Sequence, residues 1–221
     1  MSDEYTEHPM TAELAWNEDV DWERTIPFWL TQSLTAEQWE AMPEQICRRI
    51  EVVDGHVIFM QSPTYDHQSA SLGLAYAIRR DARVYATSNE LCLQTTQDFD
   101  LRIDNSPLHH RKPDVIVHDC LRDQRSRPRP SDTYLVVEIV SPSSRVTDKI
   151  EKLAVYAEAG VPHYWIVETR NGAISSVTWY ALPEDDKRYE VRACWTPAET
   201  PEGIRASEPF PVRIAWDELA F

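Results

Sequence analysis

Two segments decide the fold: KPDVIV at positions 112–117 and YLVVEIVSPSSRVTDKIEKLAVYAEAGVPHYWIVE at positions 134–168. The strand predicted at 133–140 is apolar on both faces, which is typical of a central strand covered on both sides. Apolar residues recur at helical spacing through 145–159, and 163–168 is another apolar strand. This strand–helix–strand order predicts the centre of a sheet with a helix packed against it.

The residues upstream of this centre predict one hairpin, two helices and several strands. Thr35-Ala36-Glu37-Gln38 has the spacing of a capping box and predicts a short helix. Asp54-Gly55 predicts a hairpin of 48–54 with 56–61, and residues 65–82 have the apolar spacing of a helix. We expect a loop at Pro107 and His109-His110. The expected strands lie near 83–87, 90–96, 99–103 and 113–118.

Downstream of the centre the pattern is more polar and predicts an antiparallel extension. Its expected strands are 176–182, 187–196 and 209–214, followed by a terminal helical turn at 215–219. The predicted class is therefore α/β (α+β), with a central mixed β-sheet flanked by helices and a C-terminal antiparallel extension.

Charge divides the chain into an acidic arm and the rest. The 221 residues carry a net charge of −15, and residues 1–24 hold eight acids against one base, Arg24. We interpret 1–24 as a partly disordered arm and 25–221 as a single domain. The acidity opposes general attraction to nucleic acid, so binding to DNA would need a local basic patch.

The remaining composition favours a cytoplasmic protein. No apolar run is long enough to span a bilayer, and the N-terminus lacks a basic region followed by an apolar stretch. The four cysteines have no close spacing that would suggest zinc or a redox dithiol. We expect reduced and mostly buried thiols. These cysteines are Cys47, Cys92, Cys120 and Cys194.

Two acids at predicted strands are the candidate catalytic residues. Asp114 follows Pro113 at the start of a strand, and Glu138 lies 24 residues later inside an apolar strand. A buried carboxylate without compensation costs several kcal/mol, so it needs a cation, a proton or hydrogen bonds. Two such acids on neighbouring strands would suit Mg²⁺ or Mn²⁺. The alternative is structural: an Asp that bonds local amides and a Glu paired with an arginine.

The pattern around these acids resembles the Uma family of putative restriction endonucleases, within the PD-(D/E)XK nuclease superfamily. The resemblance covers nearly the whole chain after the acidic arm. It rests on Pro113-Asp114, Val137-Glu138-Ile139-Val140-Ser141-Pro142-Ser143-Ser144, Asp148, Lys152, Tyr156 and 160–167, with Thr35–Glu37, Arg49–Gly55, Ser62-Pro63 and His67-Gln68.

The resemblance implies a restriction-endonuclease-like core and metal-dependent cleavage of DNA that leaves a 5′ phosphate. It makes Asp114 and Glu138 metal ligands, with Glu51 as an additional upstream acid. The superfamily expects a lysine two residues after the second acid, where this chain has Val140. Lys152, on the following helix, is the implied substitute that orients the attacking water.

Each further site residue has a structural alternative. Glu51 could pair with Arg48 or Arg49 across the strand, and Tyr156 could simply pack on the sheet. His67 is a candidate substrate contact or a capping or core histidine. For gripping phosphates we select Arg111, Lys112 and Arg125, from the basic segments 109–112 and 122–129. The alternative for these segments is a solvated charged loop.

Three hypotheses of function follow. The first is a Mg²⁺-dependent endonuclease acting on DNA, possible as a homodimer because cutting both strands needs two sites. The second is a nuclease-like fold that no longer cuts and serves as a binding or regulatory module, which the acidity and Val140 favour. The third is a hydrolase of another phosphoester. Two features would discriminate the first from the second: whether Lys152 reaches the carboxylates and whether a metal binds there.

Overall fold

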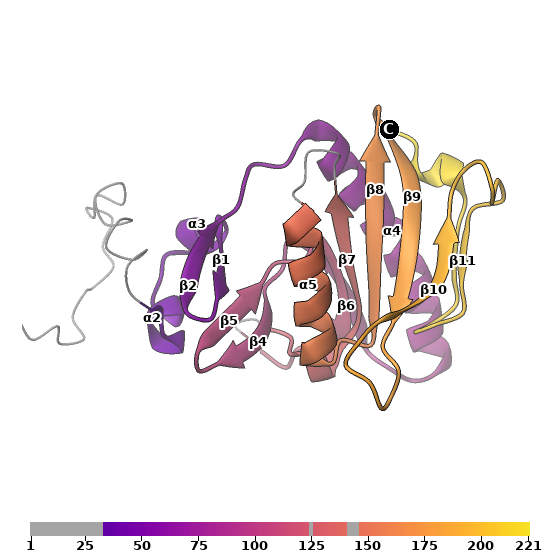
Figure 1. Ribbon diagram of the computed structural model, residues 1–221. Coiled ribbons are helices and arrows are strands. Elements are labelled where there is room, and N and C mark those ends of the chain that lie inside the picture. The colour runs from indigo at the N-terminus through magenta and orange to yellow at the C-terminus, as the bar shows by residue number, and fades with distance from the viewer. Residues whose placement is uncertain (1–32, 124–125, 141–145) are drawn as a thin grey trace, which may run out of the picture.

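A six-stranded mixed sheet forms the centre of the computed structural model, which describes residues 33–123, 126–140 and 146–221 (Figure 1). The strand order is β10-β9-β8-β7-β6-β3, and only β7 and β8 are parallel. The strands are β3 (Leu93–Gln97), β6 (Val115–Asp119), β7 (Thr133–Val140), β8 (His163–Arg170), β9 (Ala173–Ala181) and β10 (Glu190–Trp195).

Two long helices cover opposite faces of this sheet, with α5 in front and α4 behind in Figure 1. The helix α5 (Val146–Ala159) makes the crossover that parallel β7 and β8 require. The helix α4 (Tyr65–Ser88) begins at Thr64, whose hydroxyl accepts the backbone N–H of His67. The predicted mixed sheet with helices on its faces is therefore confirmed.

The two faces of β7 serve different cores because side chains alternate along a strand. Leu135, Val137 and Ile139 pack in the cluster that includes α4. Val136 and Val140 pack in the cluster that includes Tyr156 of α5. Glu138 lies on the α5 face of the strand, between Val136 and Val140.

A second sheet, in the order β2-β1-β5-β4, lies beside the α5 face (Figure 1). Its strands are β1 (Ile50–Val53), β2 (His56–Phe59), β4 (Leu101–Asn105) and β5 (Leu108–Arg111). The short helices α2 (Ala36–Glu40) and α3 (Glu44–Cys47) precede it, and Thr35 makes the predicted capping box with Gln38. A short connection, residues 112–114, leads from β5 directly into β6.

The C-terminal region is more complex than a single extension. The strands β9 and β10 continue the central sheet, whereas β11 (Ile204–Ala206) and β12 (Val212–Ile214) form a separate two-stranded sheet. The 3₁₀ segments are η1 (Pro130–Asp132) and η2 (Trp216–Leu219), the latter at the predicted terminal turn. The sequence patterns did not predict β11.

Two local predictions are wrong. Residues 83–87 are not a strand but the end of α4, because Ala82 and Ala86 continue the buried stripe of that helix at helical spacing. His109 and His110 are not in a loop. They lie in β5 and are 8% and 1% exposed, because this strand is covered on both sides.

The expectation of four reduced thiols is also wrong, since Cys92 and Cys120 form a disulfide. They follow the antiparallel register of β3 and β6, in which Leu93 faces Asp119, and their Cα atoms are 5.3 Å apart. A separation of 28 residues gives no spacing signal in the sequence. Cys47 and Cys194 are free, the first partly buried and the second exposed.

Other predictions fall outside what the structure describes or tests. The acidic arm 1–24, residues 141–145 and Arg125 are outside the described residues. Within the described part of the chain, no helix is long and apolar enough to cross a membrane.

Candidate active site

The register of β6 and β7 brings the two predicted catalytic acids together. Val115 faces Val137 and Ile116 faces Val136. Continuing this antiparallel register by one residue places Asp114 opposite Glu138. Both side chains lie on the α5 face, since Ile116 and Val136 belong to that core. The acids are 8% and 5% exposed, respectively.

Asp114 is held at three points. Its Oδ2 atom accepts the backbone N–H of Ile139 at 2.6 Å, which ties it to β7. Its Oδ1 atom lies 3.1 Å from Nε2 of His67, and its backbone carbonyl accepts the hydroxyl of Ser71 at 3.3 Å. The first turns of α4 therefore fix this acid, and the hydrogen bond to Asp114 raises the pKa of His67.

Glu138 receives one donor on each carboxylate oxygen, and both donors come from α5. Nζ of Lys152 lies 3.0 Å from Oε2, and the hydroxyl of Tyr156 donates to Oε1 at 2.8 Å. Burial raises the pKa of Glu138, the Lys152 ammonium opposes this, and the charges of Asp114 and Glu51 add to it, so that the pKa lies at about 7. The raised pKa reflects acidic groups crowded into one buried site, an arrangement that a bound cation would stabilise.

Glu51 joins the site from the second sheet, although its partners are not Arg48 or Arg49 as one sequence alternative had it. Its Oε2 atom accepts Nη1 of Arg111 at 3.0 Å. Its Oε1 atom accepts the backbone N–H of Lys112 at 2.9 Å and lies 3.6 Å from Nζ of Lys152. Burial opposes ionisation of Glu51, but the Lys152 and Arg111 charges outweigh it and lower its pKa.

Lys152 is thus placed between two carboxylates from different sheets, its side chain 15% exposed. Burial opposes its charge, but Glu138 and Glu51 raise the pKa of Lys152, so it stays protonated. Val140, at the position where the superfamily expects a lysine, packs instead in the apolar core of the same face. The helix supplies the ammonium that the strand lacks.

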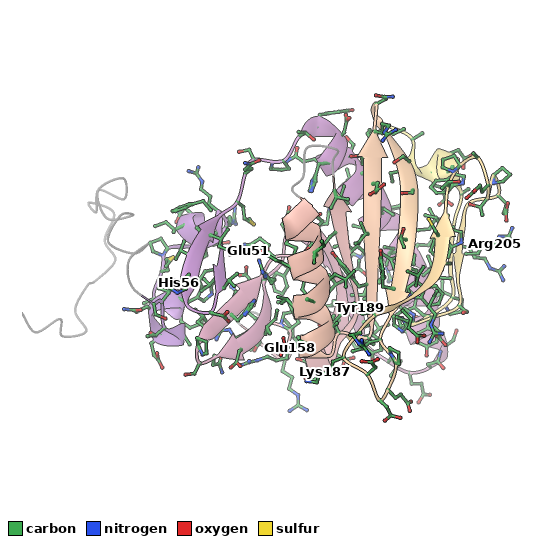
Figure 2. All side chains as sticks on the ribbon, in the orientation of Figure 1. Glu51, His56, Glu158, Lys187, Tyr189 and Arg205 are labelled. Carbon is green, nitrogen blue, oxygen red and sulfur yellow. A yellow bond between two sulfur atoms is a disulfide. The ribbon has the colours of Figure 1, made fainter. Side chains whose placement is uncertain are left out.

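The loop between β9 and β10 anchors the far end of α5. Nζ of Lys187 donates to the carbonyl of Glu158 at 3.2 Å, and the hydroxyl of Tyr189 donates to the carbonyl of Val161 at 2.8 Å. Figure 2 shows Lys187 and Tyr189 beside Glu158 at the end of α5, and Glu51 on the side of the second sheet. These contacts join the loop to the end of α5 and do not involve Glu138 or Lys152.

The predicted phosphate-gripping residues do not form a surface patch. Arg111 and Lys112 are 4% and 6% exposed. Arg111 pairs with Glu51, and Nζ of Lys112 lies 3.0 Å from Oδ1 of Asp100. Both cations are thus paired with acids inside the protein, and their burial corrects the expectation that they grip phosphate. Arg125 lies outside the described residues, and among the selected residues His67 remains at the rim, its side chain 23% exposed.

The carboxylates of the site fit a hard divalent cation that takes two protein ligands and completes its coordination with water. Among the described residues, no group of three or more His, Cys, Asp or Glu side chains is arranged to hold a metal ion. Mg²⁺ does not require such a group, because it is commonly bound through one or two carboxylates and keeps several waters. Asp114 and Glu138 supply these two carboxylates.

Two features of the site escaped the sequence interpretation: the partner of Arg111 and the presence of Asp98. Arg111 serves Glu51, and no sequence pattern pairs residues 60 positions apart. Asp98 lies near Asp114, where burial and the charge of Asp114 raise its pKa. Its backbone has φ of 48°, which is uncommon outside glycine. Tyr156 did carry a signal, since it follows Lys152 by one helical turn.

Comparison with solved structures identifies a protein that shares this fold. The chain resembles a crystal structure titled as a "putative nuclease belonging to DUF820" from Anabaena variabilis, with a TM-score of 0.58 and 15% sequence identity. The alignment covers 84% of this chain and 97% of that one. At this identity the likeness concerns the fold alone.

The sequence itself gives the family. Residues 36–217 match the model of the Uma2 family, described as "Putative restriction endonuclease". The chain belongs to this family, as the motif resemblance predicted. A comparison with curated proteins gives no match.

Proposed function

We propose that the protein is a metal-dependent endonuclease that hydrolyses DNA phosphodiester bonds. The observation that carries the proposal is the contact of Lys152 with Glu138 beside Asp114. Two carboxylates and one ammonium in a buried site are the groups needed to activate water against a phosphodiester. Membership of the Uma2 family supports nuclease activity, and the fold is compatible with it.

Asp114 and Glu138 would hold Mg²⁺ or Mn²⁺, which when bound lowers the pKa of a coordinated water and offsets charge on the phosphoryl group. The remaining work belongs to the chain. The Lys152 ammonium orients the attacking water and stabilises the negative charge that develops on the phosphoryl oxygens. Ile139 N–H and His67 keep the Asp114 carboxylate in place.

Glu51, which the resemblance implies as an additional metal ligand, has a second part in the proposal. Its oxygens accept donors from Arg111 and from the backbone of Lys112. Its remaining close neighbour in the site is Lys152. We therefore assign Glu51 to holding Lys152, so that the helix-borne lysine replaces one at position 140.

The test is cleavage of plasmid and single-stranded DNA with Mg²⁺ or Mn²⁺ by wild type, Glu138→Ala and Lys152→Ala. Metal-dependent cutting that both substitutions abolish supports the proposal. Loss in Glu138→Ala alone would keep the nuclease and remove the role of Lys152. A wild type that neither cuts nor binds metal would favour the non-cutting binding module, which the net charge of −15 and the burial of Arg111 and Lys112 also favour.

The same preparation addresses the finer parts of the proposal. Cleavage of an RNA strand and of a simple phosphodiester such as bis-p-nitrophenyl phosphate separates DNA from other phosphoester substrates. A homodimer is part of the proposal, because cutting a duplex needs two sites. Sedimentation at several protein concentrations measures it, and a monomer that still cuts both strands would remove it.

A further inference from the structure

Tyr156 is a buried tyrosine in direct contact with a proposed metal ligand. Its side chain is 0% exposed, and its hydroxyl donates to Oε1 of Glu138 at 2.8 Å. Lys152, one helical turn earlier, donates to Oε2 of the same carboxylate at 3.0 Å. One face of α5 thus provides a separate donor for each oxygen.

Packing explains the ring of Tyr156 but not its hydroxyl. The ring lies 5.3 Å from that of Tyr164 in the α5-side core, and phenylalanine would fill this space equally well. A buried hydroxyl needs a hydrogen-bond partner. Burial and the charge of Glu138 raise the pKa of Tyr156 well above its usual value, so the phenol keeps its proton and acts as the donor.

The hydroxyl restricts the one loose torsion of Glu138. The terminal torsion of a glutamate, which rotates its carboxylate plane, has only broad preferences. A donor on one oxygen alone would leave that plane free to turn about the bond. Donors on both oxygens, from residues fixed on one helix, define the orientation of the plane.

We propose that Tyr156 is a positioning residue of the nuclease site, whose hydroxyl sets the plane of the Glu138 carboxylate for metal binding and for contact with Lys152. This inference rests on the proposed function. Hydrogen-bond partners of metal ligands commonly contribute about 10- to 100-fold to metal affinity or activity. The expected contribution of the Tyr156 hydroxyl lies in this range.

The experiment compares Tyr156→Phe with the matched control Tyr189→Phe. Tyr189 lies in the same aromatic cluster, with its ring 5.8 Å from that of Tyr164. Its hydroxyl donates to a backbone carbonyl and not to Glu138. For both variants we would measure kcat and KM on DNA, the dissociation constant for Mn²⁺ by calorimetry, and thermal unfolding.

Tyr156→Phe should lower kcat or weaken Mn²⁺ binding by about 10-fold or more, with KM for DNA nearly unchanged. Tyr189→Phe should change kcat and Mn²⁺ affinity by less than about threefold. Wild-type kcat and Mn²⁺ affinity in a folded Tyr156→Phe protein would overturn the inference. Equal losses in the two variants, in proportion to lost stability, would also overturn it in favour of packing.

The Mn²⁺ measurement separates this inference from the proposed function. If the wild type binds Mn²⁺ but cuts no DNA, the nuclease proposal fails, while weaker Mn²⁺ binding by Tyr156→Phe still supports the positioning of Glu138. If the wild type cuts DNA and Tyr156→Phe matches it in every readout, only the inference about Tyr156 fails. A wild type without either property overturns both.

Discussion

The two faces of β7 lie in different environments although the same eight residues form both. Toward α4 the strand presents Leu135, Val137 and Ile139 to a wholly apolar cluster. Toward α5 it presents Glu138 between two valines, and the carboxylate meets a lysine and a tyrosine hydroxyl. One face stabilises the protein by burial, whereas the other spends stability on a buried charged cluster. The comparison shows how one strand can be both core and candidate active site.

The largest effect should follow from removing the charged group of the α5 face. Glu138→Ala should reduce metal-dependent DNA cleavage by at least about 10³-fold, because it removes a proposed metal ligand and the partner of Lys152. Its thermal midpoint should also fall, because the buried Tyr156 hydroxyl loses its acceptor and Lys152 keeps only Glu51, at 3.6 Å, so cleavage is compared well below the midpoint of the variant. Initial cleavage rates and a melting curve measure the two effects. Full cleavage by this variant would contradict our assignment of the site.

A substitution on the α4 face of β7 should instead lower stability and leave cleavage intact. Leu135 is 0% exposed, and Leu135→Ala should lower the free energy of unfolding by about 2–5 kcal/mol, because it leaves a cavity in the apolar core. Cleavage per folded molecule should stay close to that of the wild type at 20 °C. Urea unfolding checks the first statement and active-site titration with Mn²⁺ checks the second. If Leu135→Ala abolished cleavage while folded, the two faces would not be separable.

The α5 face should show an opposition between metal binding and catalysis. Lys152→Met should abolish cleavage yet tighten Mn²⁺ binding about tenfold, because an ammonium 3.0 Å from Glu138 repels a divalent cation. Methionine keeps the length and the apolar stem of the side chain. Calorimetry at pH 8 measures the affinity, with Glu138→Ala as the non-binding control. Weaker Mn²⁺ binding by Lys152→Met would show that the lysine supports the metal site.

The smallest effect concerns His163, at the start of β8. Its Nδ1 atom accepts the indole N–H of Trp179 at 3.1 Å, so this nitrogen carries no proton. Burial lowers the pKa of His163 to about 4, against about 6.5 when unfolded. Because its pKa is lower in the folded than in the unfolded state, neutral His163 favours folding. This contribution to the free energy of unfolding is complete above pH 6.5 and is lost as the pH falls from 6.5 to 4.

His163→Asn keeps an acceptor for Trp179 but does not titrate in this range. Between pH 7 and pH 5 the wild type should therefore lose about 1 kcal/mol more stability than the variant, after allowance for the partial exposure of His163. Urea unfolding at pH 7, 6 and 5 measures the difference. Parallel pH profiles for the two proteins would remove His163 as the cause. Glu138 is present in both proteins, so its titration contributes equally to the two pH profiles.

Much of the architecture around the site could be predicted from periodicity alone. The strand of residues 133–140 and the helix after it agree with the sequence patterns to within a residue, because burial on both faces and helical apolar spacing are local properties. The errors at residues 83–87 and His109-His110 have the opposite cause. There, the environment that each segment meets in the fold decided between helix, strand and loop.

The sequence by itself determined the family and the apolar centre of the sheet, and it supplied the two acids and the lysine as candidates, since these depend on residue types at fixed spacing. Only the tertiary structure decided what these groups contact. The register of β6 and β7 set Asp114 against Glu138, and the connection between the two sheets brought Glu51 to Lys152. It also turned Arg111 and Lys112 inward, because a buried carboxylate needs a cation at contact distance wherever the chain can supply one.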